Sequence, residues 1–163
     1  MRFAVVYCQD YVDRYYNAYL ELLRQYGADD IDFVVHLGDV IYEDESGSDD
    51  IPAQTDRAVV FRDPADTIPN GDVQAANTLS NYRDLYRIYG SDPVYQQVRE
   101  RWPMLVMWDD HEFSNDYWDA NATYTGGREN EHEPDRKRNA EQAFFEWMPI
   151  EVGLGSDNSL DIN

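Results

Sequence analysis

The sequence is poor in positive charge, and lysine is nearly absent from it. Its 163 residues include 13 lysines and arginines against 33 aspartates and glutamates, which gives a formal net charge of −20. This excess repels the phosphates of nucleic acids and anionic membrane surfaces, so we expect no nucleic-acid partner. Such acidity is typical of proteins from salty media. It is equally typical of carboxylate-rich loops that bind cations or stay solvated.

Cysteine and long hydrophobic runs are also scarce. Cys8 is the only cysteine, which excludes an internal disulfide framework. No stretch reaches the roughly 18 apolar residues of a membrane span. The N-terminus lacks a basic segment followed by a long apolar run, so we expect neither a membrane span nor a signal peptide in this chain. Gly-rich nucleotide-binding fingerprints are missing as well.

The remaining composition, 42% hydrophobic and 14% aromatic, is that of one globular domain. Apolar runs predict buried strands over residues 3–7, 33–37 and 104–108. Helical spacing predicts helices over residues 15–26, 79–89 and 93–102, and from Pro134 or Asp135 onward. Strands and helices alternate, so we predict an α/β fold with a mostly parallel sheet and flanking helices. The polar stretches 44–78 and 115–133, and the tail from Gly153, are predicted to be loops.

The segment DFVVHLGDVIYE, residues 32–43, passes from a predicted strand into a Gly-Asp turn. The carboxyl ends of parallel strands form the ligand crevice of an open α/β sheet. Asp39 is therefore a candidate bridging ligand of a two-metal site, and Tyr42 can return to the same side. A solvated turn aspartate is the alternative. His36 lies inside the strand and is interpreted as a packed core imidazole with satisfied nitrogens.

A second cluster, WDDHE, follows the third predicted strand. Adjacent carboxylates repel each other unless a cation neutralises them or water solvates them. Asp109 or Asp110 is a candidate metal ligand. His111 is expected to donate to an oxygen of a substrate, with Glu112 orienting its ring. Asn115 is either a further oxygen ligand or a turn residue.

Cys8 stands at the end of the first predicted strand. Unpaired cysteines usually only pack in the core, which is one interpretation of this residue. If the first strand neighbours the second, however, the Cys8 thiol lies beside Asp39 and fits the role of a metal ligand. A thiolate together with the phenolate of Tyr42 suits ferric iron better than magnesium.

With these motifs, the chain resembles the alkaline phosphatase D (PhoD) family of the calcineurin-like metallophosphoesterase superfamily. Ordinary members of the superfamily have Asp-x-His on the first strand, whereas this family has a cysteine there and a tyrosine after the Gly-Asp pair. The resemblance extends over about residues 2–150. It rests on RFAVVYCQDY (2–11), YNAY (16–19), residues 32–43, residues 81–93, WDDHE with Asn115, and AFFEWMP (143–149).

The resemblance implies half of a four-layer metallophosphoesterase sandwich that hydrolyses phosphate mono- or diesters at an iron-calcium centre. His111 would stabilise the phosphoryl transition state. The implied metal ligands are Cys8, Asp39 and Tyr42 for Fe³⁺, and Asp39, Asp110 and, as a further candidate, Asn115 for Ca²⁺. An extracytoplasmic or secreted location is implied too.

The downstream motifs of the family, a histidine and a later Asp-x-His, would lie beyond Asn163. We therefore expect residues 1–163 to form the N-terminal part of a catalytic domain, completed by a C-terminal segment. Two alternatives remain. One is a complementing half that acts only with a separate C-terminal partner. The other is a non-catalytic domain whose acidic loops at 43–50 and 129–135 bind calcium.

Overall fold

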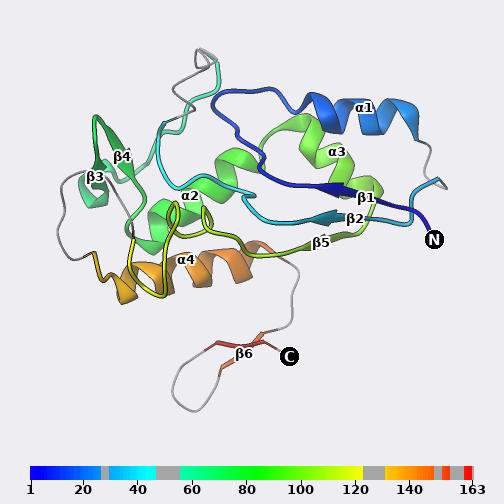
Figure 1. Cartoon of the computed structure of the whole chain (residues 1–163). Helices are drawn as coiled ribbons and strands as arrows, with labels where there is room; N and C mark the ends of the chain where they lie inside the picture. Colours follow the sequence, from blue (N-terminus) through cyan, green and yellow to red (C-terminus); the bar gives the residue numbers. More distant parts are fainter. Residues whose placement is uncertain (27–29, 47–55, 123–130, 149–151, 155–159, 163) are drawn as a thin grey trace.

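The computed structural model contains a three-stranded parallel sheet accompanied by helices (Figure 1). The structure describes residues 1–26, 30–46, 56–122, 131–148, 152–154 and 160–162. The strands are β1 (Phe3–Val6), β2 (Phe33–His36) and β5 (Met104–Val106), in the order β1-β2-β5. Both pairings are parallel. The predicted α/β fold with a parallel sheet and flanking helices is therefore confirmed.

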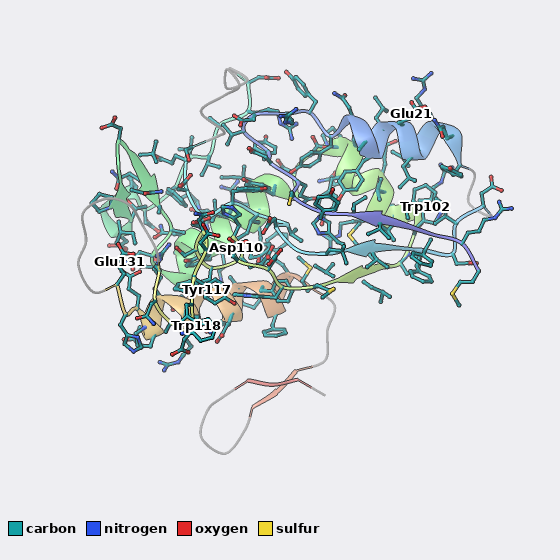
Figure 2. All side chains as sticks on the ribbon, in the orientation of Figure 1. Glu21, Trp102, Asp110, Tyr117, Trp118 and Glu131 are labelled. Atoms are coloured by element: carbon teal, nitrogen blue, oxygen red, sulfur yellow. The ribbon has the colours of Figure 1, made fainter. Side chains whose placement is uncertain are left out.

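In the described residues, four α-helices accompany the sheet, close to the predicted positions. They are α1 (Asn17–Gln25), α2 (Leu79–Tyr89), α3 (Pro93–Arg101) and α4 (Pro134–Trp147). Asp92 caps α3 by accepting from two backbone N–H groups, and Pro93 stands in the first turn. The helix ends at Arg101, and its C-cap residue Trp102 lies near the amino end of the sheet (Figure 2). In Figure 1, α1 and α3 lie side by side, and α2 packs along α4.

Two regions predicted to be loops contain short regular elements, which corrects the sequence-based expectation. In the first are the 3-10 helix η1 (Pro64–Asp66) and the antiparallel pair β3 (Ile68–Asn70) and β4 (Val73–Ala75). In the C-terminal tail, β6 (Val152–Leu154) pairs with β7 (Leu160–Ile162). Each strand has only three residues, too few for an alternation of apolar and polar positions to stand out.

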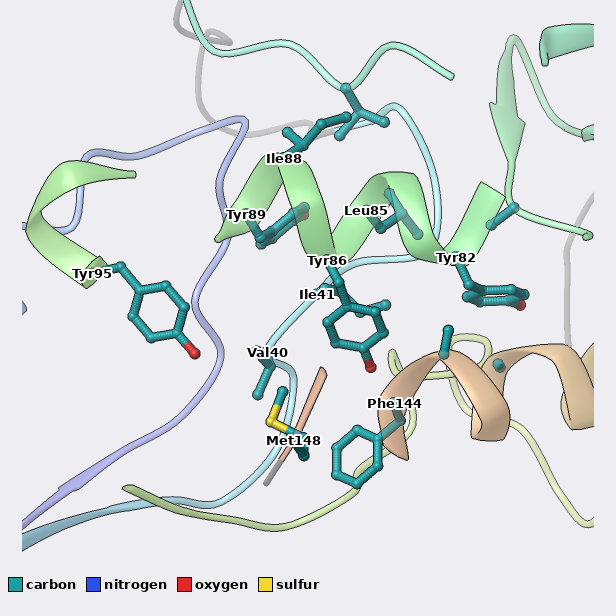
Figure 3. Packing of buried hydrophobic residues seen from close by; sticks show 14 of the residues in the cluster. Val40, Ile41, Tyr82, Leu85, Tyr86, Ile88, Tyr89, Tyr95, Phe144 and Met148 are labelled. Carbon is teal, nitrogen blue, oxygen red and sulfur yellow. The ribbon is translucent and has the colours of Figure 1, made fainter. Parts of the chain in front are cut away.

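The hydrophobic core lies between the sheet and the helices. Val34 and His36 of β2 are fully buried on this side. Figure 3 shows Tyr86 of α2 pointing towards Phe144 of α4, with Val40 and Met148 nearby in the same cluster. In the described ranges, no helix is long and apolar enough to cross a membrane.

The opposite side of the sheet is apolar and open to solvent. Alternate strand residues point outward, because side chains alternate across a strand. Leu105 is 58% exposed and Val5 is 49% exposed. We call this surface the exposed sheet face; its residues are Phe3, Val5, Tyr7, Leu37, Leu105 and Met107.

Candidate metal centre

The loops after β1 and β2 run side by side and bring Cys8 next to Asp39. The Cys8 N–H donates to the Gly38 carbonyl at 3.2 Å, and the Gln9 N–H donates to the Asp39 carbonyl at 3.0 Å. The Cys8 Sγ then lies 3.1 Å from Asp39 Oδ2. Cys8 and Asp39 have positive φ values of 52° and 55°. Strained backbone of this kind often marks a functional site.

Gly38 allows the loop after β5 to approach. Its φ is +109°, a conformation that side chains disfavour. A Cβ at this position would overlap the Asp109 side chain and lie 3.0 Å from the Asp109 backbone nitrogen. Glycine is therefore required where the two loops meet.

Asp39, Asp110 and His111 form a cluster in which one potential ligand atom of each lies within 4.8 Å of the others. Asp39 is buried, and the other two are partly exposed. Asp110 lies beyond the carboxyl end of β5 (Figure 2), and its Oδ2 accepts the Asp116 N–H at 2.7 Å. Carboxylate and imidazole groups gathered in this way can hold a metal ion.

The thiol and the phenol beside this cluster both have raised pKa values. Burial, followed by the hydrogen bond to Asp39, raises the pKa of Cys8 to about 11. Burial and the charge of Asp39 also raise the pKa of Tyr42 well above its ordinary value. Burial raises the pKa of Asp39 itself. A highly charged cation would favour the ionised form of all three groups, so this donor set fits such an ion.

His111 is held by Glu43, a contact that the sequence did not reveal. Its Nδ1 lies 2.7 Å from Glu43 Oε2, and Glu43 is 1% exposed. Burial opposes the charged imidazolium, but Glu43, Asp39 and Asp110 outweigh it and raise the pKa of His111 to about 9. The Tyr42 ring packs against the imidazole with centroids 4.2 Å apart. The sequence offered one sign of this contact, because the acidic residue Glu43 directly follows Tyr42.

Glu112 does not contact the His111 ring, which corrects the role we assigned to it. Its carboxylate accepts from the backbone N–H groups of Asp39 at 3.0 Å, Val40 at 2.6 Å and Asp109 at 2.7 Å. Burial raises the pKa of Glu112 to about 7, against the lowering effect of these hydrogen bonds. Glu112 thus fastens the loop after β2 to the loop after β5.

The other candidates lie around this centre. Asn115 is exposed; its N–H donates to Glu43 Oε1 at 2.7 Å, and its side-chain amide contacts Asp116. A ligand role for Asn115 stays a prediction. His36 is a core residue as expected: its Nδ1 accepts the Gly38 N–H, and its Nε2 lies 3.2 Å from Gln9 Oε1. Of the two acidic loops, residues 47–50 and 129–130 lie outside the described ranges.

Comparisons with known proteins point to one family. The family described as PhoD-like phosphatase matches residues 3–162. Alkaline phosphatase D of Bacillus subtilis (strain 168) is 34% identical over 152 residues, which is 93% of this chain and 23% of that protein. A solved structure titled "Structure of PhoD" has a TM-score of 0.71 and 30% identity, over 99% of this chain and 27% of that chain. The chain thus spans about a quarter of the length of these relatives.

Proposed function

This chain belongs to the PhoD-like phosphatase family, and on that basis we propose that it supplies the first part of a metal-dependent centre that hydrolyses phosphate esters. The observation that carries the proposal is the contact of Cys8 with Asp39, beside the cluster of Asp39, Asp110 and His111. These groups come from three loops at the carboxyl ends of parallel strands, where α/β proteins bind ligands.

We propose Fe³⁺ and Ca²⁺ as the metals. Cys8, Asp39 and Tyr42 would hold the iron, because thiolate and phenolate donors suit a ferric ion. Asp39 and Asp110 would hold the calcium, which prefers oxygen ligands. When bound, the two ions supply Lewis acidity for the phosphoryl oxygens and for the attacking water.

His111 is proposed to stabilise the phosphoryl transition state. Its Nδ1 is engaged by Glu43, so Nε2 is the atom that can donate to a phosphoryl oxygen. Its raised pKa keeps the ring protonated near neutral pH, which suits the negative charge that develops in the reaction. Glu43 is a positioning residue in this scheme, and Glu112 keeps the loops that carry Asp39 and Asp110 at a fixed spacing.

Small phosphate esters are the proposed substrates. A net charge of −20 disfavours the approach of polyanions, unless salt screens the field. The family resemblance adds an extracytoplasmic or secreted location to the proposal.

Elemental analysis of the chain, purified without tags or chelators, tests the metal assignment. We expect near-stoichiometric iron together with calcium, and loss of the iron in Asp39→Asn. The matched control is Asp30→Asn, because this exposed aspartate is remote from the cluster and its replacement leaves the iron in place. Iron retained by Asp39→Asn would contradict the assignment. Calcium without iron would instead favour the non-catalytic cation-binding domain.

The exposed sheet face favours a second candidate, a half-domain that needs a C-terminal partner. Contiguous apolar surface of this kind usually marks an interaction site. We expect turnover of a phosphodiester only when the chain is co-expressed with the remaining C-terminal part of an alkaline phosphatase D catalytic domain. Val5→Lys should abolish the rescue, whereas Val60→Lys, which is exposed outside the sheet, should not. Full turnover by the chain alone would rule out this candidate.

A further inference from the structure

Gln9, the residue directly after Cys8, has a buried amide side chain to which the proposed chemistry assigns no role. The residue is 6% exposed. Its Nε2–H donates to the Val40 carbonyl at 2.9 Å, and its Oε1 accepts the Tyr19 hydroxyl at 2.7 Å. The same Oε1 lies 3.2 Å from Nε2 of His36. One side chain therefore joins helix α1, strand β2 and the loop after β2.

The partners of this side chain require a neutral amide. Burial lowers the pKa of His36 to about 4, so its ring is neutral near pH 7. Its Nδ1 accepts the Gly38 N–H, so its Nε2 carries the proton and donates to Gln9. The Gln9 Oε1 thus accepts from two donors while its Nε2 faces the Val40 carbonyl, which matches the lone pairs and N–H groups of an amide. A carboxylate at this position would present only acceptors to that carbonyl.

Gln9 and its partner Val40 each follow a residue with strained backbone. Cys8 and Asp39 have positive φ values of 52° and 55°. Such conformations persist only where the surrounding structure holds them. Two backbone hydrogen bonds already join the loops, from Cys8 to Gly38 and from Gln9 to Asp39. The bond from the Gln9 side chain to Val40 extends this row of contacts to the residue just after Asp39.

We propose that Gln9 is a positioning residue, which holds the Cys8 thiol beside the Asp39 carboxylate before any metal binds. The inference rests on the proposed function, in which Cys8 and Asp39 are iron ligands. Tyr19 is 4% exposed and His36 is fully buried, so packing in the core sets the place of the Gln9 amide. Groups that orient a metal ligand in advance raise the affinity of the site, because less has to be ordered when the ion enters.

The iron affinity of the full chain, measured by competition with a chelator, tests this role without any measurement of hydrolysis. Gln9→Met keeps the length of the side chain and removes its hydrogen bonds, so we expect the affinity for iron to fall about 10–100-fold. Gln9→Asn keeps an amide that is one methylene too short to reach Val40, and it should lower the affinity in the same way. This second variant keeps the test decisive if Gln9→Met does not fold.

Tyr19→Phe is the matched control. It removes one donor to the Gln9 Oε1 from the same part of the core, and it leaves the contacts of the amide with His36 and Val40 in place. We expect Tyr19→Phe to lower the Tm of the chain and to leave its iron affinity unchanged. A purely structural role of Gln9 would instead make affinity follow Tm in all the variants.

An NMR measurement on the metal-free chain separates this inference from the metal assignment. A residue with positive φ gives a strong NOE between its own Hα and amide proton, because that conformation brings the two protons close. Cys8 should show this NOE in the parent and in Tyr19→Phe, and should lose it in both Gln9 variants. A parent chain without iron would contradict the proposed function, and the NOE would still decide the role of Gln9. The inference is overturned if a folded Gln9 variant keeps the NOE or the iron affinity of the parent, or if Tyr19→Phe lowers that affinity as much.

Discussion

At the scale of single residues, the protonation of His111 depends on its contact with Glu43. Glu43→Gln removes the charge that holds the imidazolium, so the pKa of His111 should fall from about 9 towards its ordinary value. An NMR titration of the ring in the metal-free chain measures this pKa. Glu45→Gln is the control, because the Glu45 carboxylate accepts the Gln74 N–H in another part of the structure. An unchanged pKa in Glu43→Gln would show that Asp39 and Asp110 dominate instead.

Gly38 is the residue at which backbone conformation and close approach coincide. Gly38→Ala places a Cβ against Asp109 at a φ of +109°, so we expect a loss of about 3 kcal/mol or more in the free energy of unfolding. Gly71→Ala is matched to it, with φ +59° and open space around the new Cβ, and should cost only about 1 kcal/mol. Urea denaturation compares the two variants. Equal losses would mean that the contact with Asp109 contributes nothing.

The sequence predicted the candidate metal ligands better than it predicted the residues that hold them in position. A position of Cys8 beside Asp39 was predicted on the condition that the first strand neighbours the second, and both the neighbouring strands and the contact are present. The roles of Glu43 and Glu112 depend on how two loops face each other, since the His111 contact joins residues 68 positions apart. Local sequence does not encode such a choice between nearby carboxylates.

At the scale of elements, Asp92 joins the start of α3 to the rest of the core. Its carboxylate caps the helix and pairs at 2.6 Å with Arg57, whose side chain is 7% exposed. Asp92→Ala should cost about 3–5 kcal/mol, because it leaves a buried guanidinium without its counter-ion. Thr78→Ala, which removes the cap of α2 and no ion pair, should cost about 1 kcal/mol. Thermal unfolding that ranks the variants the other way would contradict this reading.

The free energy of unfolding of the protein should fall in acid, because strand β2 buries His36. Burial lowers the pKa of His36 to about 4, below its ordinary 6.5, so the unfolded chain binds the extra proton between these values. Stability then falls as the pH drops from 6.5 to about 4, by about 3 kcal/mol from this residue. His36→Gln carries no titrating group, so its difference from the parent in urea unfolding isolates this effect. A difference that stays constant with pH would refute it.

Element prediction succeeded where caps and length reinforced periodicity. Helix α3 has Asp92 and Pro93 at its start and Pro103 after its end, so both boundaries were readable. The pair β3 and β4 lacks such support, because three-residue strands carry too little pattern and Pro69 interrupts the first.

At the scale of the whole molecule, the net charge of −20 works against compactness. Salt between ~0.01 M and ~1 M shortens the Debye length from about 30 Å to about 3 Å, so the free energy of unfolding should rise with NaCl. Urea titrations across this range measure the rise. At a pH near 4 many carboxylates become protonated and the effect should shrink. A decrease with salt would mean that surface ion pairs outweigh the repulsion.

The Glu112 carboxylate binds backbone N–H groups and no side chain of the two loops it joins. Every amino acid except proline supplies such a group. A substitution at position 109 therefore leaves the spacing of the two loops unchanged, whereas Asp39 and Val40 are constrained in addition, Asp39 by its positive φ and Val40 by its place in the core.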